Sequence, residues 1–243
     1  MSSPDAGAVV ITGASSGIGK ACAIAFAARG YHTLLLSRRL DDMVELDLAN
    51  SKCVAVDVTD ANLVRQTIQR YEANHGPIAL LINNAGIMPL GKVHSQDPAE
   101  WAAVFETNAL SVLHASSAVL PAMLSRGAGT IVSVSSIAGR NVYANHTAYS
   151  GSKFAVHAMM ESMRREYATS GVRFSVVAPG IVDTNLLSSV SDASIVASYQ
   201  QTKDRLHGGL TAENIASAIV MIHEQPDSVC IRELVIAPTP QES

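Results

Sequence analysis

The sequence predicts an α/β fold with a doubly wound, mostly parallel sheet of seven strands and helices on both faces. Short aliphatic runs alternate along the 243 residues with longer segments of helical character. Most of these runs are continuously apolar, which is typical of strands buried on both faces of a parallel sheet. The repeated strand–helix order and the absence of a linker predict a single domain over residues 1–243.

Seven runs are expected to form the strands. They are residues 8–12, 32–36, 53–56, 78–82, 130–134, 173–177 and 231–236. The first expected helix, 17–28, is rich in Ala and stops at Arg29-Gly30, a common helix end. Asp60 is a suitable N-cap for a helix over 61–74, as is Thr211 for the last helix up to residue 223. Residues 98–125 and 149–170 predict the two longest helices.

One late segment has no clear place in this pattern. Residues 185–209 form the region in question, and five serines lie between Ser188 and Ser198. A segment between the last two strands is a suitable position for a mobile lid over a substrate. An ordinary surface excursion is an equally good interpretation.

The composition excludes several classes of protein. Hydrophobic residues make up 48% of the chain and charged residues 16%, which excludes a disordered chain. The net charge of -4 leaves no broad basic surface, so we expect no nucleic-acid partner. Three widely spaced cysteines (Cys22, Cys53, Cys230) predict neither a disulfide framework nor a zinc site, and no other metal site is expected.

The expected location is cytoplasmic. Residues Met1 to Gly7 contain no basic residue and lack the pattern of a signal peptide. No apolar run approaches the ~20 residues that cross a bilayer, so we expect no membrane association.

A glycine-rich turn follows the first expected strand and opens the first helix. It contains Gly13, Ser15, Ser16, Gly17, Ile18 and Gly19. Glycines let backbone N–H groups approach a pyrophosphate, and the helix N-terminus favours its negative charge. The position between strand and helix predicts a dinucleotide site.

The end of the second strand predicts which dinucleotide binds. Ser37-Arg38 stands where an acidic residue would bind the ribose of NAD. A unit charge pair at ~4 Å contributes about 4 kcal/mol at an effective dielectric constant of ~20. Arg38 therefore favours the 2′-phosphate of NADP(H), and the alternative is a solvated basic turn.

Further motifs give a family resemblance. Asp57-Val58, Asn84-Ala85-Gly86, Ser135-Ser136, the Tyr149 to Lys153 stretch and Pro179 to Thr184 follow in order. With the glycine-rich turn, this chain resembles the short-chain dehydrogenase/reductase family from about Val9 to Thr184. It is most similar to the branch with NADP-dependent 3-hydroxy acid (serine-type) dehydrogenases and clavulanic acid dehydrogenase. The resemblance implies a Rossmann-type fold.

The resemblance also implies a role for each matching residue. Tyr149 would be the general acid/base, Lys153 its partner one turn on, Ser136 the hydrogen-bond donor to the substrate oxygen, and Asn108 the holder of a water. Tyr149 and Lys153 would also contact the cofactor. Asp57 and Val58 would contact adenine, and Asn84, Ala85 and Gly86 the adenosine ribose. Pro179, Gly180, Val182 and Thr184 would lie at the nicotinamide, with the last two holding its carboxamide.

Physical chemistry supports the Tyr149–Lys153 pairing. A free tyrosine has a pKa near ~10 and is a poor base at neutral pH. A Lys charge at ~4 Å supplies the roughly 4 kcal/mol that lowers this pKa by ~3 units. A proton donor at the carbonyl oxygen lowers the barrier to hydride transfer.

The sequence therefore predicts an NADP(H)-dependent oxidoreductase that interconverts a small carbonyl compound and its alcohol. A non-catalytic NADP-binding regulator, or an epimerase or dehydratase, are the alternatives on this scaffold. Arg140, Asn141 and His146 are candidates to shape the substrate pocket with the 185–209 region. Arg140 would either hold a substrate carboxylate or be a solvated loop residue. The resemblance further implies a homodimer or homotetramer, formed through the two longest helices.

Overall fold

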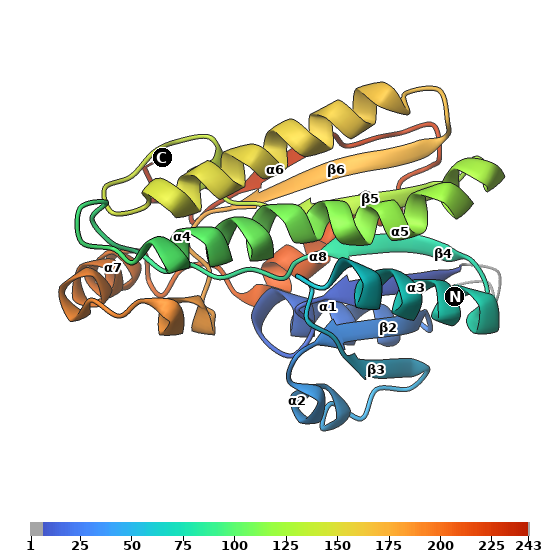
Figure 1. Cartoon of the computed structure of the whole chain (residues 1–243), viewed down its shortest axis with the longest axis horizontal. Coiled ribbons are helices and arrows are strands. Elements are labelled where there is room, and N and C mark those ends of the chain that lie inside the picture. Colours follow the sequence, from blue (N-terminus) through green and yellow to red (C-terminus); the bar gives the residue numbers. More distant parts are fainter. Residues whose placement is uncertain (1–6, 243) are drawn as a thin grey trace.

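The computed structural model describes residues 7–242, and these form one seven-stranded sheet with the order β3-β2-β1-β4-β5-β6-β7 (Figure 1). All six pairs of neighbouring strands are parallel. The strands are β1 (Ala8–Thr12), β2 (His32–Ser37), β3 (Ser51–Ala55), β4 (Ile78–Asn83), β5 (Gly129–Val134), β6 (Val172–Pro179) and β7 (Glu233–Ile236). Residues 1–6, in which we find no signal-peptide pattern, lie outside the described part of the chain.

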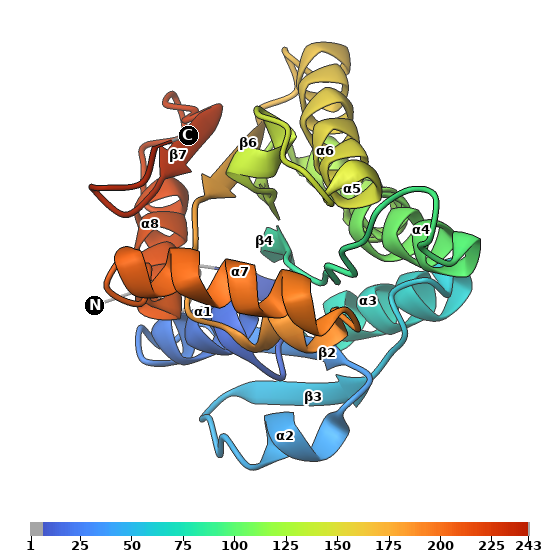
Figure 2. The ribbon, with the colours of Figure 1, turned by 90° about the vertical axis from the view of Figure 1, so that its left-hand side faces the viewer.

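Helices cover both faces of this sheet. They are α1 (Gly17–Ala27), α2 (Leu40–Val44), α3 (Ala61–His75), α4 (Pro98–Phe105), α5 (Ser111–Arg126), α6 (Thr147–Glu166), α7 (Ala193–Arg205) and α8 (Ala212–His223). Figure 2 shows α3, α5 and α6 on one side of the sheet and α1 and α8 on the other. The doubly wound fold predicted from the sequence is confirmed.

The strand sequences explain why both faces need a helical layer. Val10 and Leu34 pack in the core beneath α3, α5 and α6, whereas their neighbours Val9 and Leu35 pack beneath α1 and α8. Consecutive residues of a strand point to opposite faces, so a continuously apolar strand buries both of its sides. Cys22 belongs to the second core as a buried free thiol.

The expected caps are present at two helix starts. The Asp60 carboxylate accepts hydrogen bonds from the backbone N–H groups of Asn62 and Leu63 at the start of α3. Thr211 and Asn214 form a reciprocal capping box at the start of α8. Both caps satisfy backbone donors that the first helical turn leaves unpaired.

Three local features differ from the predicted pattern or were absent from it. The expected helix over 98–125 is divided into α4 and α5 by a π-helical turn, Glu106–Leu110. The unassigned 185–209 region contains a 3₁₀ turn, Asn185–Ser189, and α7. The short helix α2 was not predicted, because five residues are too few to show helical periodicity.

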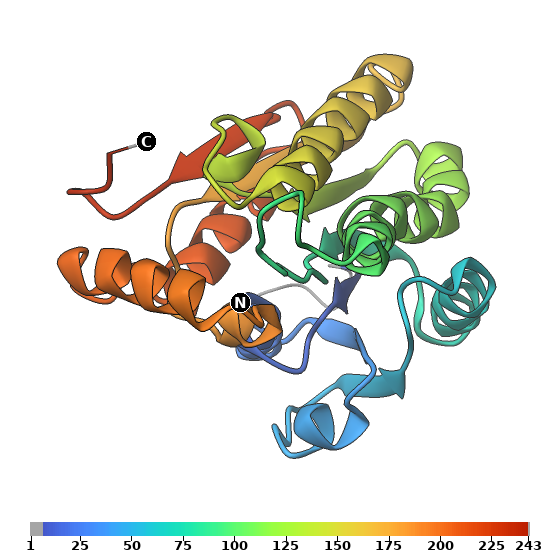
Figure 3. The same ribbon diagram turned by 60° about the vertical axis from the view of Figure 1, so that its left-hand side comes forward.

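The fold brings the functional motifs to one edge of the sheet. The strand order reverses between β1 and β4, and ligands bind outside the carboxyl ends of parallel strands at such a point. In Figure 2, α7 lies across this edge, and Figure 3 shows it facing the loop between β4 and α4. Within residues 7–242, no helix is both long and apolar enough to cross a membrane.

Candidate active site

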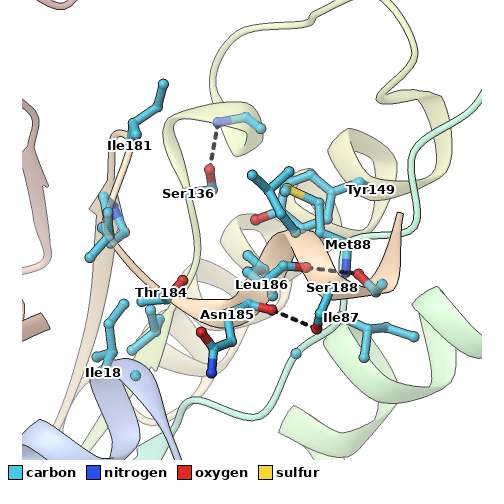
Figure 4. A pocket seen from close by; sticks show the side chains of 18 of the residues that line it. Ile18, Ile87, Met88, Ser136, Tyr149, Ile181, Thr184, Asn185, Leu186 and Ser188 are labelled. Carbon is cyan, nitrogen blue, oxygen red and sulfur yellow. Dashed lines mark hydrogen bonds between the residues drawn. The ribbon is translucent and has the colours of Figure 1, made fainter. Parts of the chain in front are cut away.

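A cavity of about 2130 Å³ lies at the carboxyl ends of the strands, between the glycine-rich turn and α7. Figure 4 shows Tyr149, Met88 and Leu186 together on one wall and Ile18 near Thr184 at another. Ser136, Tyr149 and Lys153 all line the cavity. Among the described residues, no group of three or more His, Cys, Asp or Glu side chains is arranged to hold a metal ion.

The glycine-rich turn leaves the start of α1 open to the cavity. Ser16, the N-cap residue of α1, makes no side-chain capping bond, and the first turn contains no acidic residue. A Cβ atom on Gly13 would lie 2.9 Å from the Cα atom of Ala85, so only glycine fits there. Gly17 has a φ of +52°, which also favours glycine. The free N–H groups and this close packing fit a bound pyrophosphate.

Gly19 differs from the other residues predicted to contact the cofactor. It is buried and does not line the cavity. A Cβ atom there would collide with the carbonyl oxygen of Gly13. Gly19 therefore allows the turn to pack against the helix, and its predicted contact with the cofactor stays a prediction.

The loop after β4 is held against this turn by Asn84. Its side-chain amide donates to the carbonyl oxygens of Thr12, at 3.0 Å, and Gly13, at 3.2 Å. The Thr12 hydroxyl in turn accepts hydrogen bonds from the N–H groups of Asn84 and Ala85. These bonds fix the position of Asn84, Ala85 and Gly86, all of which line the cavity.

Two arginines lie at the far end of this cavity. Arg38, which the sequence singled out, is exposed and lines the cavity. Arg39 lines it too, and its Nη2 atom lies 2.8 Å from Ser15 Oγ and 2.9 Å from Ser16 Oγ. Sequence reasoning missed Arg39, although its place beside Arg38 was a usable signal. Positive charge thus collects next to Ser37, which also lines the cavity.

Asp57 and Val58 follow β3 on the same side of the cavity. The Asp57 carboxylate accepts hydrogen bonds from the backbone N–H and the hydroxyl of Thr59, at 3.0 Å and 2.8 Å. These bonds lower the pKa of Asp57 below its ordinary value, and the charge of Arg38 contributes in the same direction. Asp57 is therefore a fixed, ionised acceptor at this wall.

Tyr149 and Lys153 lie one helical turn apart at the start of α6, and both are buried. The Lys153 Nζ atom lies 5.7 Å from the centre of the Tyr149 ring and donates to the carbonyl oxygen of Val134 at 3.1 Å. Burial lowers the pKa of Lys153 to about 8. Burial also raises the pKa of Tyr149 above its ordinary value, and the hydrogen bond from Ser136 opposes this only in part.

The pKa of Tyr149 shifts in the direction opposite to the one expected from the sequence. We expected the charge of Lys153 to lower the pKa of Tyr149. In this structure the loss of solvent dominates at Tyr149, so the phenol holds its proton at neutral pH. A buried, protonated Tyr149 is a proton donor.

Asn108 lies behind the cavity wall, not on it. It is buried in the π-helical turn, where its Oδ1 accepts from the Ile87 N–H and its Nδ2 donates to the Ile87 carbonyl, both at 2.9 Å. The Nδ2 atom also donates to Ser152 Oγ at 3.1 Å. The extra residue of the π turn thus turns the amide toward the loop after β4.

The segment after β6 closes the side of the cavity. Pro179, Gly180, Val182 and Thr184 line it, as do Leu186, Leu187, Ser188 and Ser189 of the 3₁₀ turn. The hydroxyl of Ser189 accepts a hydrogen bond from the backbone N–H of Met88 at 3.1 Å. The 185–209 region is therefore attached to the loop after β4 across the cavity.

Two candidates for the substrate pocket do not lie in it. Arg140 and Asn141 are absent from the cavity wall, whereas His146 is part of it. Arg140 Nη1 instead lies 2.7 Å from the carboxylate of Glu233 in β7. Arg140 thus pairs with a partner distant in sequence and lies outside the cavity wall, which does not favour the alternative that it holds a substrate carboxylate.

Comparisons with known proteins agree with this fold. Residues 7–194 match the family model of the short chain dehydrogenases. An uncharacterized oxidoreductase of Listeria monocytogenes, Lmo0432, is 33% identical over 96% of each chain. Glycine betaine reductase ATRR of Emericella nidulans is 35% identical over 94% of this chain, which spans only 18% of that protein's length.

Solved structures with the same fold include a closed form of serine dehydrogenase complexed with NADP+. Its TM-score is 0.88 at 24% identity, with 97% of this chain and 96% of that chain covered. An alcohol dehydrogenase of the archaeon Thermococcus sibiricus, complexed with 5-hydroxy-NADP, has a TM-score of 0.83 at 25% identity and 98% coverage of both chains. The chain therefore belongs to the short chain dehydrogenase family of oxidoreductases.

Proposed function

We propose that this protein is an NADP(H)-dependent oxidoreductase that interconverts a small carbonyl compound and its alcohol. One observation carries the proposal: Ser136, Tyr149 and Lys153 line the same cavity as the glycine-rich turn and two arginines. The cavity can therefore hold a dinucleotide with its reactive end beside a proton donor. The archaeal alcohol dehydrogenase described above is complexed with 5-hydroxy-NADP, which supports the same choice of cofactor.

The residues of this cavity fit NADP(H) from end to end. The open start of α1 would bind the pyrophosphate, and Arg38 and Arg39 would pair with the 2′-phosphate. Other lining residues would hold the remaining parts: Asp57 and Val58 the adenine, Asn84, Ala85 and Gly86 the ribose, and Pro179, Gly180, Val182 and Thr184 the nicotinamide. When bound, the nicotinamide supplies or accepts the hydride at its C4 atom.

The side chains around Tyr149 would manage the proton. In reduction, the Tyr149 hydroxyl gives its proton to the substrate oxygen as hydride reaches the carbonyl carbon, and the product is an alcohol. Ser136 stabilises the negative charge that builds on that oxygen, because its hydroxyl lines the same wall. Lys153 restores the Tyr149 proton, and Asn108, held by Ile87 and Ser152, supports the water path behind it.

We also propose that the chain acts as one catalytic domain, in which residues 185–209 form the substrate segment. We propose further that the protein is located in the cytoplasm. Its three cysteines are free, which fits a reducing compartment. A second copy would cover the large apolar side chains exposed on the two longest helical segments. These are Phe105, Leu110, Leu113 and Phe154. A homodimer or homotetramer would bury this surface.

The experiment that tests the function is a carbonyl and alcohol panel with NADPH and NADH in parallel. We expect oxidation of NADPH coupled one-to-one to alcohol formation. Tyr149→Phe should lower turnover at least 1000-fold while changing the Kd for NADPH less than threefold. NADPH binding without turnover of any substrate would instead indicate a regulator, and substrate conversion without net nicotinamide oxidation an epimerase or dehydratase.

A further inference from the structure

We propose that the substrate is a neutral carbonyl compound bearing an aromatic or other bulky apolar group, rather than a carboxylate. This inference rests on the proposed function and concerns the substrate end of the same cavity. It comes from three features of that end: an apolar wall, uncharged rings around Tyr149, and the engagement of every nearby cation by another group.

The wall around Tyr149 is a separate apolar cluster of the protein. Five of its residues are buried: Met88, Leu90, Ala138, Tyr149 and Ile195. Five partly buried side chains pack against them, namely Tyr143, Leu186, Leu187, Val190 and Tyr199, and every member of the cluster except Val190 lines the cavity. They come from the loop after β4, the segment after β5, α6 and the 185–209 region. Such a surface gains free energy when it takes an apolar group out of water.

Aromatic rings approach Tyr149 from its own side of the cavity. The His146 ring lies 6.2 Å from the Tyr149 ring and 5.6 Å from the Tyr143 ring, with interplanar angles of 65° and 57°. Burial lowers the pKa of His146 below its ordinary value, so this ring is neutral at pH 7. Burial also raises the pKa of Tyr199, which therefore carries no charge either. These uncharged rings add flat apolar surface beside Tyr149, against which an aromatic or other apolar substituent can pack.

Each cation that lines the cavity, among the described residues, lies at the dinucleotide turn or is bonded to another group. Lys20, Arg38 and Arg39 lie at the dinucleotide turn, and Lys153 is bonded to Val134. In α7, the Lys203 Nζ atom lies 2.5 Å from Asp183 Oδ1, and Arg205, which is exposed, donates to Thr202 Oγ1 at 3.2 Å. None of these cations belongs to the apolar cluster, so a carboxylate placed against this wall would lose water without gaining an ion pair there.

The Tyr143 side chain adds a neutral polar group to this end. The hydroxyl of Tyr143 is buried and has no hydrogen-bond partner among the described residues. Tyr143 lines the cavity and buried polar groups are normally paired, so a polar ligand atom is a candidate partner for this hydroxyl. An ester, ether or second carbonyl oxygen on the substrate would satisfy it without introducing charge.

The test compares two substrates of the same skeleton, methyl benzoylformate and benzoylformate, with NADPH and the wild-type protein. Both have a ketone beside a phenyl ring, and they differ in the charge of the neighbouring group. We expect kcat/KM for the ester to exceed that for the acid at least 100-fold. An acid turned over within tenfold of the ester would overturn the proposal.

Two variants test the apolar wall, and a third controls for a general disturbance of α7. Tyr199→Ala should lower kcat/KM for the ester at least tenfold, mainly through KM, with the Kd for NADPH unchanged. Gln201→Ala is the matched control, because Gln201 is exposed on the same helix and does not line the cavity. Leu187→Arg, which places a cation in the wall, should narrow the ester-to-acid ratio at least tenfold. A ratio unchanged by this cation would count against the charge argument.

A binding experiment distinguishes failure of this inference from failure of the proposed function. If neither ketone is reduced with NADPH or NADH, the function is wrong for these substrates, but the wall can still be examined. Ligand-observed NMR with the NADPH complex would then compare methyl benzoate with benzoate as unreactive probes. Tighter binding of the ester supports the apolar wall, and equal or tighter binding of benzoate overturns it.

Discussion

The Nε atom of Arg39 lies 2.6 Å from the Oδ2 atom of Asp42, and this ion pair holds the guanidinium over the glycine-rich turn. Both side chains are about half exposed, so the pair adds at most about 1 kcal/mol to stability. Its importance is positional. The same guanidinium contacts the hydroxyls of Ser15 and Ser16 at the end of the cavity proposed for the 2′-phosphate.

We predict that Arg39→Ala weakens NADPH binding at least tenfold, about 1.4 kcal/mol, while the Kd for NADH changes less than threefold. The reason is that only NADPH carries the phosphate that a guanidinium can pair with. Fluorescence titration of both nucleotides measures the two Kd values.

Arg38→Ala provides the comparison within the same turn. If both arginines pair with the phosphate, each variant loses affinity for NADPH selectively. Equal losses of NADPH and NADH affinity in both variants would contradict phosphate recognition at this turn.

Lys153 predicts a pH dependence of the reaction. Because burial lowers its pKa to about 8, the amine is charged below that pH and neutral above it. The buried Tyr149 phenol has a raised pKa and stays protonated across the same range. We therefore expect kcat/KM for carbonyl reduction to fall as the pH rises above about 8.

Lys153→Arg is the control for this assignment. A guanidinium keeps its charge well above pH 8, so the residual activity of the variant should lose the alkaline fall. A fall at the same pH in Lys153→Arg would assign it to another group.

Ser189 predicts how the 185–209 region contributes to substrate binding. Ser189→Ala removes the acceptor of the Met88 N–H bond, which joins the 3₁₀ turn to the opposite wall. We expect KM for the carbonyl substrate to rise several-fold, with the Kd for NADPH within twofold of wild type. Ser194→Ala should behave as wild type, because Ser194 is exposed, does not line the cavity, and bonds through its hydroxyl to Asp192 in its own turn. Similar KM values in the two variants would show that this bond does not hold the segment.

His223, at the end of α8, predicts a loss of stability in acid. Burial lowers its pKa from 6.5 to about 4, and the charge of Arg173 acts in the same direction. The unfolded chain then binds more protons than the folded one between these values, so stability falls as the pH drops through this range. The full effect is at most about 3 kcal/mol. Urea unfolding of wild type and His223→Phe at pH 7 and pH 4.5 should show a smaller loss in the variant.

The sequence by itself determined the fold and most of the candidate residues. Continuously apolar strands can only be buried on two faces, so the order of elements was readable without contacts. The glycine-rich turn and Tyr149–Lys153 were also readable, because their geometry depends on residues adjacent in the chain. A functional element that consists of one helical turn or one tight turn can be predicted from the residues of that turn alone.

Only the tertiary structure decided which side chains are paired with other groups of the protein and which are buried. Arg140 pairs with Glu233, which is 93 residues away in the sequence. Arg39, at the start of α2, reaches Ser15 and Ser16, and Gly19 packs against the carbonyl oxygen of Gly13. Burial at the edge of the sheet, rather than the spacing of Tyr149 and Lys153, sets the pKa values of both. Charge pairing and desolvation depend on neighbours from distant segments, which a sequence pattern does not reveal.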